Sequence, residues 1–371
     1  MQGCMPRRCL KCLMPLDIPE SDPNHSALCN WCRIGFPNYQ PKGEHCLREF
    51  LEANRNRAGG TDCLVGISGG KDSSYAALEL KRTYGMQVEA FTYLHDGLTS
   101  LALENAKRIC QRLGIQHHFI SLPGGEHLKS FKDYFRVWLE RPGKVSAAMT
   151  CVVCKHLYLL GTRLAALRKI PMVVWANCPL ENPPFLALRP ESHKGSSDFK
   201  RESIVKASSR LLNEIFCPSF LTLGLLRHFK TSVLGCLAVT PSSKYLRMRY
   251  PAVKHVFFYE FCKWNPIKII QRLRAQTEWM RPDIPDDWHS DCIFNMFKEY
   301  MFQKMLGISY TDAFLSNQIR HDLISREEAR AKLLESKKYY ASKILEALTA
   351  VGLESLHYKI DISCFDIRHE T

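Results

Sequence analysis

The sequence has little of what marks a secreted or membrane-bound chain. Its first residues, MQGCMPRRCLKC, contain no apolar segment of the kind that signal peptides have. The longest apolar runs, such as Pro218–Leu226, fall short of the roughly 20 residues that span a bilayer. We therefore expect a cytoplasmic protein with no membrane attachment. Internal repeats and low-complexity segments are also absent, which argues against a solenoid.

The composition is that of a globular protein with an excess of positive charge. The 371 residues are enough for two or three domains, and 46% are hydrophobic. The net charge of +14 is spread along the chain. It favours RNA or a phosphate-bearing small substrate, although it could also reflect only a solvated surface. The 16 cysteines, without a signal peptide, indicate metal or redox chemistry more than disulfides.

The pattern of residues changes along the chain. The first segment is rich in Cys, Pro and Asn with few periodic apolar residues, so it should need a metal to fold. A linking helix over residues 46–57 and a boundary at Gly59-Gly60 follow. We expect three regions: a zinc-binding domain (1–45), a nucleotide-binding domain (46–260, with an insertion at 183–255 that covers the site) and a mostly helical region (261–371).

Short apolar strands alternate with helices from Asp62 onward, which predicts a doubly wound α/β fold with a parallel sheet. The predicted strands are Cys63–Ile67, Gln87–Tyr93, His117–Ser121, Met172–Ala176 and Phe257–Tyr259. The predicted helices between them are Asp72–Tyr84, Ala102–Leu113 and Leu157–Leu167. Ser325 and Glu328 have the spacing of a capping box and should open a helix.

A glycine turn between the first strand and the first helix is the most informative segment. It reads Ser68-Gly69-Gly70-Lys71-Asp72-Ser73-Ser74. Glycines let a backbone approach a phosphate, and the following helix N-terminus attracts anions. The segment lacks the spacing of the Walker motif G-x-x-x-x-G-K-S/T but matches S-G-G-x-D-S, so it resembles the PP-loop ATP pyrophosphatases. The resemblance implies a PP-loop (HUP-like) fold that binds ATP through these seven residues and transfers AMP to a substrate oxygen, releasing pyrophosphate.

The loop after the second predicted strand, His95-Asp96-Gly97, lies where a doubly wound fold positions groups that contact a nucleotide, outside the carboxyl ends of strands. The resemblance to the PP-loop enzymes implies that this loop lies near the adenosine. We expect Asp72 or Asp96 to help hold Mg²⁺, and Lys71 and Asp72 to act in catalysis. Arg320 and Arg326 could bind phosphate or substrate, or could simply be solvated or paired.

Two pairs of cysteines open the chain. Cys9 and Cys12 form one C-x-x-C, and Cys29 and Cys32 form another, with sixteen residues between the pairs. This spacing is typical of a tetrahedral Zn²⁺ site. We expect a closed structural site.

A second C-x-x-C, Cys151 and Cys154, precedes a predicted helix. In a PP-loop protein this pair resembles the iron–sulfur-dependent tRNA 2-thiolation enzymes, in which three cysteines hold a 4Fe–4S cluster. The resemblance implies a third ligand, and we favour Cys292 over Cys262. The remaining candidates are Cys178, Cys217 and Cys236. Alternatively, Cys151 and Cys154 could form a persulfide or disulfide relay, or could be buried thiols.

Most of the chain also resembles the bacterial N-acetyl sugar amidotransferases, which use ammonia from a glutaminase partner. The likeness rests on Cys9-Leu10-Lys11-Cys12-Leu13-Met14-Pro15, on residues 261–266 and on residues 315–329. The Cys151/Cys154 pair is not part of that pattern, which suggests sulfur in place of nitrogen. We therefore expect an ATP-dependent sulfur transferase acting on a nucleobase-type small molecule or a tRNA base, with an amidotransferase as the alternative. The expected cofactors are ATP, Mg²⁺, Zn²⁺ and a 4Fe–4S cluster; a second copy of the chain is a candidate partner.

Overall fold

The computed structural model describes residues 7–16, 27–33, 39–181, 214–285 and 289–365. The first part of the predicted insertion, residues 183–213, lies outside the described residues, as does Trp288.

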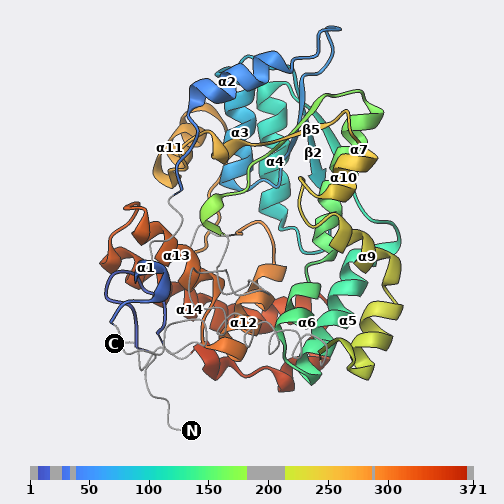
Figure 1. The fold of residues 1–371 in the computed structure, drawn as a ribbon. Coiled ribbons are helices and arrows are strands. Elements are labelled where there is room, and N and C mark those ends of the chain that lie inside the picture. The colour runs from blue at the N-terminus through green and yellow to red at the C-terminus, as the bar shows by residue number, and fades with distance from the viewer. Residues whose placement is uncertain (1–6, 17–26, 34–38, 182–213, 286–288, 366–371) are drawn as a thin grey trace, which may run out of the picture.

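A parallel sheet of five strands forms the upper half of the molecule in Figure 1, and its strand order is β3-β2-β1-β4-β5. All four strand pairings are parallel. The predicted α/β fold with a doubly wound parallel sheet is therefore confirmed. The strands are β1 (Cys63–Gly66), β2 (Val88–Tyr93), β3 (Gln116–Ile120), β4 (Met172–Trp175) and β5 (Lys254–Phe257).

The last strand was predicted too late in the chain. The strand ends at Phe257, and the apolar residues Phe258 and Tyr259 lie in the 3₁₀ turn η6 (Phe258–Glu260). Both side chains are buried, at 1% and 0% exposed. A short apolar run does not distinguish a buried strand from a buried turn.

The two faces of the sheet carry different helices, because successive side chains of a strand point to opposite sides. Cys63 and Val65 of β1 pack into one core with α2, α3, α4 and α11, whereas Leu64 packs into another with α7 and α10. The helices that cover the sheet are α2 (Glu44–Ala53), α3 (Lys71–Arg82), α4 (Ser100–Leu113), α7 (His156–Leu167), α10 (Lys244–Arg249) and α11 (Pro266–Gln276).

A second, helical body lies below the sheet in Figure 1, with its own core of aromatic side chains. Phe131 and Phe294 stack there with ring centroids 4.1 Å apart. The cysteines Cys9, Cys12 and Cys29 belong to the same core. The elements of this half are α1 (Asn30–Arg33), α5 (Glu126–Glu140), α6 (Lys144–Met149), α12 (Phe294–Leu306), α13 (Tyr310–Arg320), α14 (Arg326–Ala350), η7 (Glu354–Lys359) and η8 (Ile362–Phe365).

Shorter elements connect these parts: η1 (Pro123–Gly125), η2 (Val153–Lys155), η3 (Pro179–Glu181), the π-helix η5 (Phe220–Leu226) and α9 (Phe229–Leu237). The capping box at the start of α14 is present, since the side chains of Ser325 and Glu328 each accept a backbone N–H of the other residue. One helical stretch, residues 144–167, is long and apolar enough to cross a membrane, but 56% of its apolar window is buried inside the protein. A core helix passes the same test.

Candidate active site and metal centres

The phosphate-loop sequence forms a tight turn between β1 and α3. Gly69 has a φ of +84°, a left-handed conformation that favours glycine, and a Cβ atom there would lie 1.8 Å from the carbonyl oxygen of Ala102. Ser68 is held from within the turn, because its N–H donates to Ser73 Oγ at 3.2 Å. Ser74 Oγ is buried without a hydrogen-bond partner among the described residues. The turn therefore leaves the N-terminus of α3 open to an anion.

Lys71 pairs with its neighbour Asp72, and the loop that carries them is fixed by partners that lie far away in sequence. Lys71 Nζ donates to Asp72 Oδ2 at 2.9 Å, and the Lys71 side chain is only 6% exposed. The other Asp72 carboxylate oxygen accepts from Trp264 Nε1 at 2.8 Å. Trp279 Nε1 donates to the Gly69 carbonyl at 2.9 Å. Two tryptophans from the C-terminal half thus fix the loop.

Two carboxylates and a histidine that the sequence analysis missed lie beside this loop. The Asp291 carboxylate lies beside the loop: a Cβ atom at Gly70 would be 3.9 Å from it, and an interaction with Ser68 opposes the burial that raises the pKa of Asp291. His289 lies between the carboxylates of Glu181 and Asp291. Its Nε2 is 3.9 Å from Glu181, and its Nδ1 is 4.0 Å from Asp291. Burial, and then the charge of Asp72, raise the pKa of Glu181 to about 8. Glu181 is in η3, just beyond the carboxyl end of β4. Ligands of such folds bind outside the carboxyl ends of strands, so the rule that pointed to Asp96 could also have pointed to Glu181.

Three of the predicted cluster ligands come together from two segments. Cys151 and Cys154 interact with each other, and this interaction raises the pKa of Cys151 and lowers that of Cys154. The charge of Cys292 raises the pKa of Cys154, and the charge of Cys151 adds to the effect of burial in raising the pKa of Cys292. Burial lowers the pKa of Lys298, on α12, but the charges of the three thiols and of Tyr310 outweigh this effect and raise it. The three thiols are therefore coupled electrostatically to one cation.

The segment that carries Cys292 also contacts the phosphate loop. Residues 291–294 run beside the loop after β2: Leu98 and Cys292 form an antiparallel bridge, and the N–H of Thr99 donates to the Asp291 carbonyl at 3.0 Å. Because Asp291 is the neighbour of Cys292 and a partner of Ser68, the thiols and the phosphate loop are linked by two consecutive residues.

A buried histidine supports Cys154. His127 Nε2 lies 3.3 Å from Cys154 Sγ, and His127 Nδ1 lies 3.0 Å from Tyr93 Oη. Burial lowers the pKa of His127 to about 4, so the ring is neutral near pH 7. His95 stacks on His127 with ring centroids 4.7 Å apart. Asp96, in contrast, is exposed, and its described interactions are electrostatic ones with this histidine group rather than with the phosphate loop.

The other candidate third ligands lie elsewhere. Cys262 is in the core beside α3, with its Sγ 3.6 Å from Tyr84 Oη. Cys217 contacts Ser219 Oγ at 3.2 Å, and Cys236 is exposed on α9. Cys178 is buried beyond β4, where the charges of Glu181 and Asp72 raise its pKa in addition to burial. Of the five candidates, Cys292 is the one that shares its surroundings with both Cys151 and Cys154.

The N-terminal cysteines form a group that could hold a metal ion: the sulfurs of Cys9, Cys12, Cys29 and Cys32 all lie within 4.8 Å of one another. Arg320 of α13 donates to three of them, at 3.2 Å to Cys12, 3.4 Å to Cys32 and 3.6 Å to Cys29. Arg326 donates to the carbonyl oxygen of Cys9 at 3.5 Å. Both arginines considered as phosphate or substrate ligands therefore face the cysteine group.

No protein-family model matches the chain. Over 87 residues, 24% of this chain, the sequence is 31% identical to a 7-cyano-7-deazaguanine synthase of Chromohalobacter salexigens. The match spans 34% of that relative's length, about one third. The expected similarity to PP-loop ATP pyrophosphatases is confirmed.

Solved structures with a similar arrangement of elements share little sequence with the chain. The U34-tRNA thiolase NcsA from Methanococcus maripaludis with its 4Fe–4S cluster is 12% identical, with a TM-score of 0.36, over 92% of this chain and 89% of its own. The NH3-dependent NAD synthetase from Campylobacter jejuni is 16% identical (TM-score 0.29; 53% of this chain, 94% of its own). The NMN synthetase from Francisella tularensis is 14% identical (TM-score 0.28; 65% of this chain, 97% of its own). TM-scores this low carry no information about function.

Proposed function

We propose that the protein is a cytoplasmic ATP-dependent sulfur transferase. It adenylylates a carbonyl oxygen of its substrate and replaces that oxygen with sulfur, releasing AMP and pyrophosphate. The observation that carries the proposal is the continuity of Asp291 and Cys292, because the Asp291 carboxylate lies beside Gly70 of the phosphate loop and Cys292 interacts electrostatically with Cys151 and Cys154. Activation and sulfur delivery can then take place in neighbouring positions.

The phosphate loop supports the first step. The residues from Ser68 to Ser74 would hold the β- and γ-phosphates of ATP through backbone N–H groups and the buried Lys71. Attack of the substrate oxygen on the α-phosphorus forms a new P–O bond and breaks the bond to pyrophosphate. The departing charge develops toward Lys71 and the N-terminus of α3, where donors are already fixed.

The carboxylates near the loop suit a divalent cation. Asp72, Glu181 and Asp291 offer oxygen donors from three separate elements, and oxygen donors are the ligands that Mg²⁺ prefers. The raised pKa of Glu181 reflects burial and the neighbouring charge of Asp72, which a cation would offset. We therefore propose Asp72 with Glu181 and Asp291 as the Mg²⁺ ligands, in place of the exposed Asp96.

The thiols support the second step. Three thiols that are coupled electrostatically to one another and to Lys298 suit a 4Fe–4S cluster with three protein ligands, and such a cluster would supply sulfide to the activated carbon. Lys298 offsets the charge of the thiolates. His127 can donate its Nε2–H to Cys154 Sγ when Tyr93 donates to Nδ1. The same thiols could instead carry a persulfide.

The N-terminal cysteine group would hold Zn²⁺ as a structural ion, since four thiolates leave no open position. The substrate class is a nucleobase-type molecule or a tRNA base. The partial likeness to a 7-cyano-7-deazaguanine synthase supports a base of that kind.

The test is oxygen-free purification followed by analysis of metal, acid-labile sulfide and products. We expect about four irons per chain and absorbance near 400 nm, and AMP and pyrophosphate when the acceptor is supplied. Cys151→Ala should lose the iron and keep the zinc. A colourless protein that transfers ammonia from a glutaminase would point to the amidotransferase instead, and release of ADP would overturn the proposal.

A further inference from the structure

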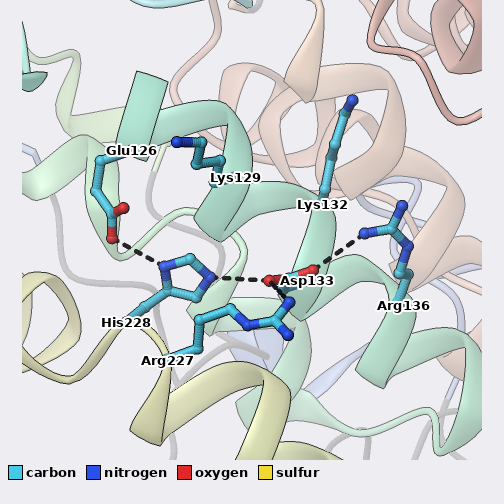
Figure 2. Close-up of a pocket in the computed structure, with 7 residues that line it drawn as sticks. All are labelled: Glu126, Lys129, Lys132, Asp133, Arg136, Arg227 and His228. Carbon is cyan, nitrogen blue, oxygen red and sulfur yellow. Dashed lines mark hydrogen bonds and ion pairs between the residues drawn. The ribbon is translucent and has the colours of Figure 1, made fainter. Parts of the chain in front are cut away.

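A pocket outside the phosphate-loop site lies between α5 and the η5–α9 junction. Its volume is about 310 Å³, and Figure 2 shows that side chains from both sides line it. The lining residues are Glu126, Lys129, Lys132, Asp133, Arg136, Arg227 and His228. The four on α5 from Lys129 to Arg136 follow helical spacing, so one face of the helix forms the wall.

The floor of the pocket is a built network of hydrogen bonds. The side chain of Asp133 is 7% exposed and accepts from Arg227 at 2.9 Å, from His228 at 3.0 Å and from Arg136 at 3.0 Å. His228, itself 2% exposed, also contacts Glu126 Oε1 at 2.8 Å. Figure 2 shows this chain of contacts running from Glu126 through His228 to Asp133 and the two arginines. One carboxylate therefore holds two guanidinium groups at the pocket wall.

The charges around the pocket do not balance. Lys129, Lys132, Arg136 and Arg227 give four positive charges, against two negative charges from Glu126 and Asp133. Both acids are engaged by the network, whereas no hydrogen bond or ion pair of the Lys129 or Lys132 side chain is found within the described part of the chain. The pocket thus has a surplus of two cations and suits an anion, and Arg with Lys is the combination that binds phosphate.

The pocket shares its walls with the elements that hold Cys154. His127 lies on α5 beside Glu126, and its ring contacts Cys154 Sγ at 3.3 Å. On the other wall, the carbonyl oxygen of Thr231 in α9 accepts a hydrogen bond from His156 Nε2 at 2.8 Å. His156 is two residues after Cys154. The helix α5 therefore carries both the wall of the pocket and the histidine that contacts Cys154.

We propose that this pocket is a second phosphate site, which binds a phosphate group of the acceptor substrate while the substrate's carbonyl lies between the phosphate loop and the thiols. That the phosphate belongs to the acceptor substrate rests on the proposed function. The pocket's affinity for phosphate does not depend on that function. The phosphate could belong to a nucleic-acid backbone or to a phosphorylated small molecule.

The test compares the full-length double variant Lys129→Ala/Lys132→Ala with a control of equal charge, Lys107→Ala/Lys268→Ala, whose lysines are exposed on α4 and α11. Binding of a labelled single-stranded RNA is measured by fluorescence anisotropy at several salt concentrations. Stabilisation by inorganic phosphate is measured by thermal unfolding. The pocket variant should bind RNA about tenfold more weakly, with a salt slope reduced by about 1.4 for two lost contacts, and the control should match the wild type.

The outcomes separate the sources of the phosphate. Loss of both RNA binding and phosphate stabilisation identifies a nucleic-acid backbone. Loss of phosphate stabilisation alone identifies a phosphorylated small molecule. A pocket variant that behaves as the control in both measurements overturns the proposal. Release of AMP is followed in parallel; its absence in the wild type would count against the proposed function while leaving the phosphate site intact.

Discussion

The molecule holds two sets of cysteines that begin with the same C-x-x-C spacing and differ in what surrounds them. The N-terminal set has four sulfurs within 4.8 Å of one another, and Arg320 donates to three of them. The interior set has three thiols that are coupled electrostatically to Lys298, and it adjoins Asp291, which lies beside the phosphate loop. The first offers a metal four sulfurs, whereas the second offers three. Spacing alone therefore does not separate the centre that we propose to be structural from the one that we propose to be reactive; the number of sulfurs and the neighbouring phosphate loop do.

The largest expected effect comes from replacing one cysteine of each set. Cys154→Ser should lower sulfur transfer by a factor on the order of 10³ because it removes a group in direct contact with the reacting centre. The melting temperature should change little, since Cys154 lies at the edge of the core. Turnover is measured as AMP released per chain, and unfolding by circular dichroism.

Cys12→Ser should do the reverse. Loss of the metal removes the N-terminal segment from its packing against α13 and α14, at a cost on the order of 4 kcal/mol. Comparable loss of stability in both cysteine variants would break the distinction between the two sets.

A change in the phosphate loop should spare both sets. In the proposed mechanism the ammonium group of Lys71 faces the departing pyrophosphate, so Lys71→Ala should reduce turnover about 10²- to 10³-fold. Iron and zinc contents, measured by mass spectrometry, should stay at the wild-type values. Loss of iron together with activity would show that the loop and the thiols form one structural unit.

A smaller effect should follow from Arg320→Gln. The guanidinium group offsets the charge of the N-terminal thiolates, so its loss should weaken zinc binding about 10- to 100-fold, measured by competition with a chromogenic chelator. Arg326→Gln is the matched control, because Arg326 contacts the backbone of Cys9 and not the sulfurs. Iron content should be unchanged in both, and equal zinc loss in the control would contradict this role of Arg320.

The last expected effect concerns pH. The pKa of Glu181 is raised from 4.5 to about 8 by burial and by Asp72, so the folded chain binds a proton that the unfolded chain releases. The stability from this group is fully present below about pH 4.5 and is lost as the pH rises toward about 8. Urea unfolding at several pH values should show this decline in the wild type, and Glu181→Gln should flatten it. An unchanged slope in the variant would exclude Glu181 as its source.

The local sequence was enough to predict the sheet and the phosphate loop. Strands such as Met172–Trp175 are buried on all sides and therefore read as apolar runs, and the Ser68–Ser74 motif needs only its flanking strand and helix. The helix α5 was not predicted, although its residues supply both His127 and the wall of the pocket that we propose to bind phosphate.

Residues whose role depends on tertiary contact could not be read from the sequence. Trp264 fixes Asp72 from 192 positions away, and Arg320 reaches Cys12 across 308 positions. No periodicity or spacing carries that information. Asp291 and Glu181 were partly predictable from the sequence. Asp291 adjoins Cys292, a predicted ligand, and Glu181 follows a predicted strand.

The contacts between the N-terminal segment and α13 also have a consequence for the order of folding. Like Arg320 and the cysteines, Arg8 and Asp312 are distant in sequence. They pair across 304 positions, so the two partners are synthesised far apart in time. Chains grow from the N-terminus at about 5–20 residues per second, so the cysteines leave the ribosome many seconds before α13. During that interval they can take up a metal but cannot dock. Contacts of such long sequence separation form late, and the docking of the first segment should be among the last steps of assembly.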